Sequence, residues 1–236
     1  MLLKAENLDC RIAHSQILRS CSLNADKGEI VSLLGRNGAG KTSVLKNILG
    51  LYTPQDGKII FKDQDITNIT PRERVLMGIG YSPEDSKLFP QLSVAENINL
   101  GFWISQKTER SGSFDMEKAF HIFPAIKDLY NRKAENLSGG EKKMVSIARA
   151  LALNPSLVLL DESLEGLSPR IIKGFSEAIK SIRDDLDISV LIAESNIYNA
   201  SRVAHRAYII ERGEIYFEGT SEEILQSEKL LTMVGK

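Results

Sequence analysis

Cysteine and histidine are scarce in this chain. Its 236 residues include two cysteines, Cys10 and Cys21, and three histidines. A disulfide framework or a thiolate metal site needs more cysteines at closer spacing, and no C-x-x-C pair is present. The three histidines are scattered and form no ligand motif. We therefore expect two buried, reduced thiols, as in proteins of a reducing compartment.

An excess of charge and long apolar runs are also missing. Thirty Lys and Arg residues face thirty-one Asp and Glu residues, so the formal net charge is −1. This balance does not supply the basic field of a nucleic-acid-binding protein, and we expect no nucleic-acid partner. No apolar stretch approaches the roughly 18 residues that span a bilayer, and the first residues do not resemble a secretory signal. We expect a cytoplasmic protein that reaches a membrane only through a partner.

An alternation of strand and helix signals runs through most of the chain. The short apolar runs at 30–34 and 157–160 are typical of strands buried on both faces of a parallel sheet. Further strand signals lie at 2–8, 16–23, 57–61, 79–82, 189–193, 208–210 and 214–217, the last two forming a hairpin. Helix signals lie at 42–49, 71–77, 115–123, 141–153, 170–184 and 198–203. The pattern predicts an α/β fold interrupted by a helical insertion, with a polar loop at 105–113.

The most informative segment follows the strand signal at 30–34. It reads Gly-Arg-Asn-Gly-Ala-Gly-Lys-Thr and matches G-x-x-x-x-G-K-[ST] between a strand and a helix, the context that this pattern requires. Glycines let the backbone approach phosphates closely, and free N–H groups at the helix start attract them. Lys41 would reach the β- and γ-phosphates of ATP, and Thr42 would offer a hydroxyl to Mg²⁺. The predicted phosphate-binding residues are Gly35, Arg36, Asn37, Gly38, Ala39, Gly40, Lys41, Thr42 and Ser43.

Two carboxylates close the apolar run at 157–160. Asp161, at the end of a strand beside the phosphate loop, would hold Mg²⁺ directly or through water. Glu162 would orient and polarise the attacking water. Taken alone, two acids after a strand are as easily read as solvated side chains, and the phosphate loop is what favours the catalytic interpretation.

A third motif, Leu-Ser-Gly-Gly-Glu, occupies residues 137–141 at the start of a helix signal. Ser138 can simply cap that helix, although the free N–H groups of such a start also form an anion site. The order of the three motifs resembles the ABC ATPase cassette over the whole chain. The resemblance implies one domain with a P-loop NTPase (RecA-like) core and an N-terminal antiparallel β subdomain, at about 1–90 and 155–236. It also implies a helical subdomain at about 91–154.

The resemblance also implies partners. Two ABC ATPase subunits, identical or different, would pair head to tail, and polytopic membrane permease subunits would hold them at the inner face of the cell membrane. The signature residues would then act on the nucleotide bound by the other subunit, namely Ser138, Gly139, Gly140 and Glu141. Within the family, the segments at 81–84, 88–98 and 165–169 resemble the smaller ATPase subunit of branched-chain amino-acid importers. Uptake of a small polar solute is the implied task.

Several positions depart from the pattern of the family. Ile12 stands on the adenine side, where most cassettes carry an aromatic residue, and it lacks a π face for the base. Glu84 stands where a Gln usually meets Mg²⁺ and the membrane subunit. Ser195 replaces the His that contacts the γ-phosphate, and a hydroxyl has neither the charge nor the reach of an imidazole. Ser168 stands where many cassettes carry an Asp.

These departures leave two alternatives to an ATPase that drives transport by hydrolysis at its own site. The chain would be a weakly hydrolysing regulatory subunit paired with a more active paralogue, or a non-transport ABC ATPase. The latter is the weaker alternative, because the chain has neither a long coiled-coil insertion nor a second cassette.

Overall fold

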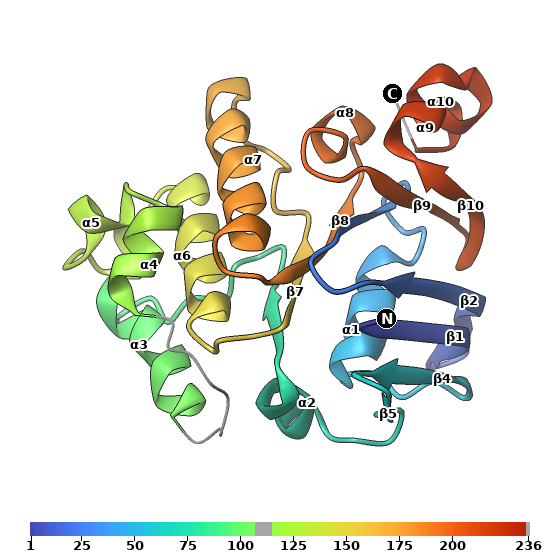
Figure 1. Ribbon diagram of the computed structural model, residues 1–236, viewed down its shortest axis with the longest axis horizontal. Coiled ribbons are helices and arrows are strands. Elements are labelled where there is room, and N and C mark those ends of the chain that lie inside the picture. The colour runs from blue at the N-terminus through green and yellow to red at the C-terminus, as the bar shows by residue number, and fades with distance from the viewer. Residues whose placement is uncertain (107–114, 235–236) are drawn as a thin grey trace.

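The computed structural model describes residues 1–106 and 115–234, and within these ranges the chain forms two β-sheets flanked by helices (Figure 1). The larger sheet has the strand order β10-β9-β3-β8-β7-β6. Its strands are β3 (Ile30–Leu34), β6 (Ile79–Ser82), β7 (Leu157–Asp161), β8 (Ser189–Glu194), β9 (Arg206–Glu211) and β10 (Glu214–Thr220). The smaller, antiparallel sheet has the order β2-β1-β4-β5. Its strands are β1 (Leu3–Ile12), β2 (Ser15–Ala25), β4 (Asp56–Phe61) and β5 (Gln64–Asp65).

The helices of the described ranges connect and cover these strands. They are α1 (Lys41–Leu49), α2 (Pro71–Met77), α3 (Val94–Ser105), α4 (Met116–Ile122), α5 (Ile126–Leu129), α6 (Gly139–Leu151), α7 (Pro169–Asp184), α8 (Ile197–Ala200), α9 (Ser221–Gln226) and α10 (Glu228–Val234). A 3₁₀ turn, η1, spans Ala134–Asn136. The α/β fold with an N-terminal antiparallel sheet is therefore confirmed. Of the polar loop expected at 105–113, Ser105 ends α3 and residues 107–113 lie outside the described residues.

Parallel pairing dominates the centre of the large sheet. The strands β3, β8, β7 and β6 run parallel, and every residue of β3, β7 and β8 is buried. Along β7, Leu157 and Leu159 pack into the core around α1, whereas Val158 and Leu160 pack into the core of the helical side. Successive side chains of a strand point to opposite faces, so a strand covered on both faces must be apolar throughout. This is why the continuous apolar runs predicted the central strands.

The helix that follows the phosphate loop lies between the two sheets. Val44, Leu45 and Ile48 of α1 pack in one core with residues of β1, β4, β3 and β7. The helices α3, α4, α5 and α6 gather on the opposite side of β7 (Figure 1). The loop before α1 is thus held between a rigid sheet and a helix that is buried along much of its length.

Two local features differ from the sequence interpretation. Residues 64–65, which carried no strand signal, form the short strand β5 against β4, and Lys62 and Asp63 make the turn between them, both at positive φ. The helices α9 and α10 were not predicted. Their signal was present, because Thr220 caps α9 in a capping box with Glu223.

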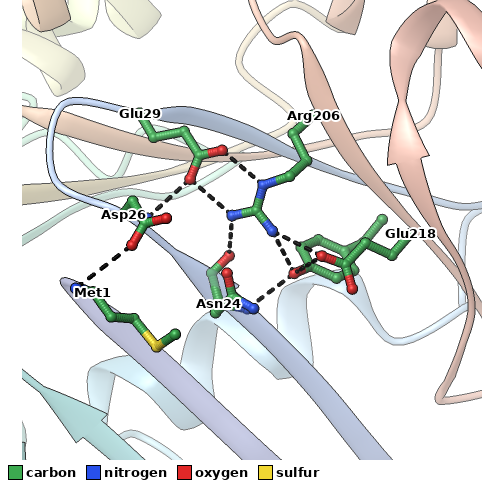
Figure 2. Close-up of polar contacts among 7 residues, drawn as sticks. Met1, Asn24, Asp26, Glu29, Arg206 and Glu218 are labelled. Carbon is green, nitrogen blue, oxygen red and sulfur yellow. Dashed lines mark hydrogen bonds and ion pairs between the residues drawn. The ribbon is translucent and has the colours of Figure 1, made fainter.

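A network of polar side chains joins the two sheets at the start of β3 (Figure 2). Both oxygens of Glu29 accept hydrogen bonds from the guanidinium of Arg206 at 2.7 Å. The same guanidinium donates to the carbonyl oxygen of Asn24 at 3.0 Å and to Oε1 of Glu218 at 3.0 Å. One planar fork therefore fixes the ends of β2, β3, β9 and β10 relative to one another, which anchors the strand that leads into the phosphate loop.

Arg74 of α2 stabilises the other end of α1. Its side chain is 1% exposed and donates to four backbone carbonyls, those of Asn47, Ile48, Thr67 and Ile69, at 2.7–2.9 Å. The last carbonyls of a helix have no partner within the helix, so a buried helix end needs such donors. Arg74 supplies them for α1.

We predict that Arg74→Met lowers the free energy of unfolding by about 3 kcal/mol, because it leaves buried carbonyls without donors. Chemical denaturation measures this, and Arg72→Met, an exposed position on the same helix, is the matched control. Equal stability of the two variants would contradict the capping role of Arg74.

Candidate functional site

The glycine loop lies at the carboxyl end of β3 and opens directly into α1. A Cβ at Gly35 would lie 2.5 Å from the carbonyl oxygen of Ile210, and Gly38 has φ 82°, so only glycine suits either position. Gly40 precedes α1 at φ 117°, and no side chain caps the helix. The first N–H groups of α1 therefore point from the loop without side-chain acceptors, as an anion site requires.

Lys41 is buried at the base of this loop, with 5% of its side chain exposed. Its ammonium donates to the carbonyls of Gly35 at 2.7 Å and Arg36 at 3.2 Å. It also pairs with Oε1 of Glu162 at 2.9 Å. The cation and the catalytic carboxylate predicted from separate motifs thus meet in one buried ion pair.

Asp161 ends β7 beside the first turn of α1. Its Oδ1 accepts a hydrogen bond from the Thr42 hydroxyl at 3.1 Å, and its Oδ2 accepts one from the Tyr81 hydroxyl at 3.1 Å. Burial raises the pKa of this carboxyl above its usual range, although both hydrogen bonds act in the opposite direction. A divalent cation would stabilise the ionised form.

The donor set around Asp161 suits magnesium. Thr42 and Asp161 offer a hydroxyl and a carboxylate in contact, and Glu84 lies in the same hollows. Mg²⁺ prefers oxygen ligands and takes only one or two from protein when phosphates and water complete its shell. Among the described residues, no group of three or more His, Cys, Asp or Glu side chains could by itself hold a metal ion.

Glu162 is held on three sides. Its backbone has φ 47°, an unusual conformation for a residue other than glycine. Its Oε2 accepts hydrogen bonds from the backbone N–H of Ser195 at 3.1 Å and from the Ser195 hydroxyl at 3.3 Å. Lys143 of α6 donates to the backbone carbonyls of Glu162 and Glu165. The structure therefore brings Ser195, predicted from its place in the pattern, to the carboxylate that the sequence predicts as catalytic.

A buried acid beside Ser195 was not predicted as a site residue. Glu194 is 0% exposed, and its Oε1 accepts the backbone N–H of Leu164 at 2.9 Å. Its Oε2 has no hydrogen-bond partner among the described residues. Burial raises the pKa of this carboxyl. The only sequence signal is an acid that closes the apolar run at 189–193, the same signal that identified Asp161.

Two hollows lie on either side of Thr42. The first, of about 470 Å³, is lined by Ile17, Asn37, Gly38, Gly40, Lys41, Thr42, Ser43, Glu84 and Glu162. The second, of about 490 Å³, includes Thr42, Tyr81, Glu84 and Asp161 in its walls. A nucleoside triphosphate in the first hollow would place its phosphates against the phosphate loop. Its metal ion would then lie toward the second hollow.

Two groups of predicted residues lie elsewhere. Ile12 ends β1 with 40% of its surface exposed and does not line the first hollow, whereas Ile17 of β2 does. The role of Ile12 beside the base stays a prediction. The segment Ser138–Glu141 starts α6 in a capping box and lines neither hollow. In Figure 1, α6 and α1 lie on opposite sides of β7, so the signature helix lies apart from this chain's own phosphate loop.

The phosphate loop also touches the end of the described chain. The Arg36 guanidinium donates to the carbonyl oxygen of Thr232 in α10 at 2.6 Å. Arg36 therefore extends away from the first hollow, which does not include it among its lining residues. Its predicted contact with phosphate would come from its backbone.

Fold and site together define a phosphate-loop nucleotide-binding protein with a parallel central sheet. Residues 18–165 match the family model described as ABC transporter. The chain is 32% identical over 228 residues to a probable branched-chain amino acid transport ATP-binding protein, LivF, of Archaeoglobus fulgidus, covering 97% of this chain and 96% of that protein. It is 36% identical over 232 residues to the lipopolysaccharide export system ATP-binding protein LptB of Escherichia coli K12, covering 96% and 93%.

A solved structure shows the same fold. The ADP conformation of an ATP-binding cassette of an ABC transporter superposes with a TM-score of 0.84 at 26% identity, covering 100% of this chain and 99% of that one. The chain belongs to the ABC transporter family, as an ATP-binding subunit, and it is an ATP hydrolase of the ABC type. Among the described residues, no helix has the length and apolar character needed to span a bilayer.

We predict that Lys41→Ala weakens ATP binding by about a hundredfold or more, because charge-assisted hydrogen bonds to phosphate contribute about 1.5–3 kcal/mol each. Equilibrium binding of a fluorescent ATP analogue measures the loss. Lys58→Ala, at an exposed position on β4 that lines neither hollow, is the control. Unchanged affinity in Lys41→Ala would refute the assignment.

Proposed function

We propose that this chain binds Mg-ATP at residues 35–43 and hydrolyses it with Glu162 to drive a membrane transporter. The meeting of Lys41, Asp161 and Glu162 at one sheet edge supports this most directly. Mg²⁺, held by Thr42 and Asp161 with Glu84 nearby, would neutralise charge on the β- and γ-phosphates. The chain's own groups supply the rest of the chemistry.

The ion pair between Lys41 and Glu162 would keep the general base engaged until ATP binds. An ammonium has three donors, and here they are directed to two loop carbonyls and to Glu162. A phosphate at the loop competes for this ammonium, which releases Oε1 of Glu162. The backbone N–H and hydroxyl of Ser195 still hold Oε2. The freed oxygen can then accept a proton from the attacking water as general base.

A regulatory role remains the second candidate, and Ser195 is the observation that favours it. Its hydroxyl donates to Glu162, and a serine has no cationic form to meet a γ-phosphate. In a head-to-tail pair, this chain's site would then be slower than a site completed by an imidazole. The signature residues Ser138–Glu141 would serve the nucleotide of the other subunit, since they lie apart from this chain's own loop.

Steady-state ATP hydrolysis by the purified chain separates the two candidates. We expect wild type to turn over ATP at about 1 s⁻¹ or faster, within the usual enzymatic range. Glu162→Gln should bind ATP normally and lose at least about 100-fold in kcat, because the general base is removed. Hydrolysis at an unaltered rate by this variant would rule out Glu162 as the base. A slow wild type that Ser195→His accelerates would instead favour the regulatory role.

The membrane partner would dock at an apolar hollow behind the site. This hollow, of about 290 Å³, is lined by Tyr81, Phe89, Leu100, Gly101, Ile104, Arg149, Ala150 and Leu153. Phe89, Trp103 and Ile104 expose 54%, 59% and 43% of their surfaces at its rim or beside it, whereas Phe102 packs against the helical core. Exposed aromatic side chains around a hollow suit a short amphipathic helix, here from a permease subunit.

We predict that Phe89→Ser releases the permease subunits during purification but leaves ATP hydrolysis by the isolated chain within about twofold, because surface substitutions cost little stability. Tyr216→Ser, at an aromatic on β10 that is 47% exposed, should keep the complex intact. Retention of the permease by Phe89→Ser would remove this hollow from the docking surface.

The transported solute is the finest part of the proposal. Similarity to LivF supports branched-chain amino acids, and similarity to LptB supports lipopolysaccharide export at a slightly higher identity. We favour uptake of branched-chain amino acids, because the Pro83–Glu84 pair and the segment 165–169 resemble the smaller ATPase subunit of importers for these solutes. Stimulation of ATP hydrolysis in the reconstituted complex by leucine with its binding protein, and not by lipopolysaccharide, is the expected outcome.

A further inference from the structure

The turn at residues 162–165, directly after β7, begins with Glu162 in an unfavourable backbone conformation. Glu162 has φ 47°, in the left-handed region that a residue with a Cβ atom seldom adopts. Its N–H donates to the carbonyl oxygen of Ala193 at 2.9 Å, and its own carbonyl oxygen accepts the N–H of Glu165 at 3.3 Å. Residues strained in this way persist only where the surrounding structure fixes them. The groups that hold this turn therefore determine where the Glu162 carboxylate points.

Lys143 of α6 binds the turn at both of its ends. Its ammonium donates to the carbonyl oxygen of Glu162 and, at 2.8 Å, to that of Glu165. Burial lowers the pKa of Lys143 below its usual range, although the nearby carboxyl groups, that of Glu194 first among them, act in the opposite direction. A lysine gives up hydration only where partners replace the water, and here backbone carbonyls of the turn are those partners.

A second contact with the turn comes from β8. Oε1 of Glu194, at the end of that strand, accepts the backbone N–H of Leu164 at 2.9 Å. The Leu164 side chain is fully buried in the core of the helical side. The turn is therefore attached to the sheet through Glu194 and to α6 through Lys143, and the contact from α6 is the one that reaches the backbone of Glu162 itself.

The two lysines that reach Glu162 differ in their access to a nucleotide. Lys41 pairs with the Glu162 carboxylate and lines the first hollow, so phosphates compete for it. Lys143 binds the backbone of Glu162 and lines neither the first nor the second hollow. In the proposed mechanism, ATP draws Lys41 away from the carboxylate. The contact of Lys143 with the turn is unaffected by that exchange.

We propose that Lys143 is a positioning residue: its ammonium fixes the backbone of the turn, so that the Glu162 carboxylate stays directed at the attacking water after Lys41 has moved to the phosphates. The inference rests on the proposed role of Glu162 as general base. Lys143 acts only through the backbone that it binds. Its loss therefore slows hydrolysis and spares nucleotide affinity, because the phosphate loop forms its hollow without it.

The first test is Lys143→Met, which keeps an apolar stem and removes the ammonium. We expect kcat for ATP hydrolysis to fall about tenfold or more, because a small displacement of a catalytic group is costly in rate. Affinity for a fluorescent ATP analogue should stay within twofold of wild type. Lys127→Met, at an exposed lysine of α5, is the control and should change neither quantity. A kcat within twofold of wild type, or a loss of nucleotide binding together with kcat, would overturn the positioning role.

A double-mutant cycle shows whether Lys143 acts through Glu162. Glu162→Gln has no general base to position, so adding Lys143→Met should lower its residual kcat by less than twofold. A full tenfold loss in that background would show that Lys143 acts by another route, against the proposal. If Glu162→Gln alone hydrolyses ATP at the wild-type rate, the proposed function is refuted instead, so the two failures are distinguishable.

Chemical rescue separates the ammonium from general packing at the same position. Both native thiols are buried, with Cys10 1% and Cys21 0% exposed, so alkylation of Lys143→Cys is directed to the introduced thiol. S-aminoethylation rebuilds a chain of lysine length that ends in an ammonium, and it should restore kcat to within about threefold of wild type. S-propylation gives a neutral chain of the same length and should leave kcat as low as in Lys143→Met. Equal rates after the two treatments would contradict the inference.

Discussion

Parallel pairing of β3, β8, β7 and β6 is the constraint on which the rest of this structure depends. Parallel strands end at the same edge, so whatever follows each strand meets its neighbours there. The phosphate loop follows β3, Asp161 closes β7, Ser195 follows β8, and Glu84 comes shortly after β6. Segments separated by more than a hundred positions are thereby brought within hydrogen-bonding distance.

At this edge of the sheet, the ammonium of Lys41 lies among several carboxyl groups. Lys41 and Glu162 are each 5% exposed and paired, and Asp161, Glu84 and Glu194 surround them. Separating buried charges from water is costly, and removing one partner leaves the other uncompensated. Such a site is most stable when further positive charge arrives with the phosphates. At the proposed magnesium site, the ion would therefore balance the protein's own carboxylates as well as the phosphates of the nucleotide.

Motifs that are contiguous in sequence were the predictable part of the site. The glycine loop, Asp161 and Glu162 follow apolar runs directly, so their place at strand ends could be read from the pattern, and the buried strands confirmed it. Tyr81, Lys143 and Glu194 could not be found in this way. The Tyr81 hydroxyl reaches Asp161 from the neighbouring strand β6, and the Lys143 ammonium reaches the backbone of Glu162 from α6. Glu194 stands out because it is completely buried. Each of these features is set by tertiary packing.

The position of β3 in the sheet has a consequence for how the chain folds. β3 carries the phosphate loop, yet its neighbours are β8 and β9, with Ile30 opposite Val190 and Val31 opposite Arg206. Pairing between such distant segments is slow and follows the closure of a very long loop. During synthesis on the ribosome, β3 cannot pair with β8 and β9 until the last third of the chain has emerged. The nucleotide site is therefore among the last parts of the molecule to form, because an incomplete chain lacks the strands that hold the phosphate loop beside Glu162.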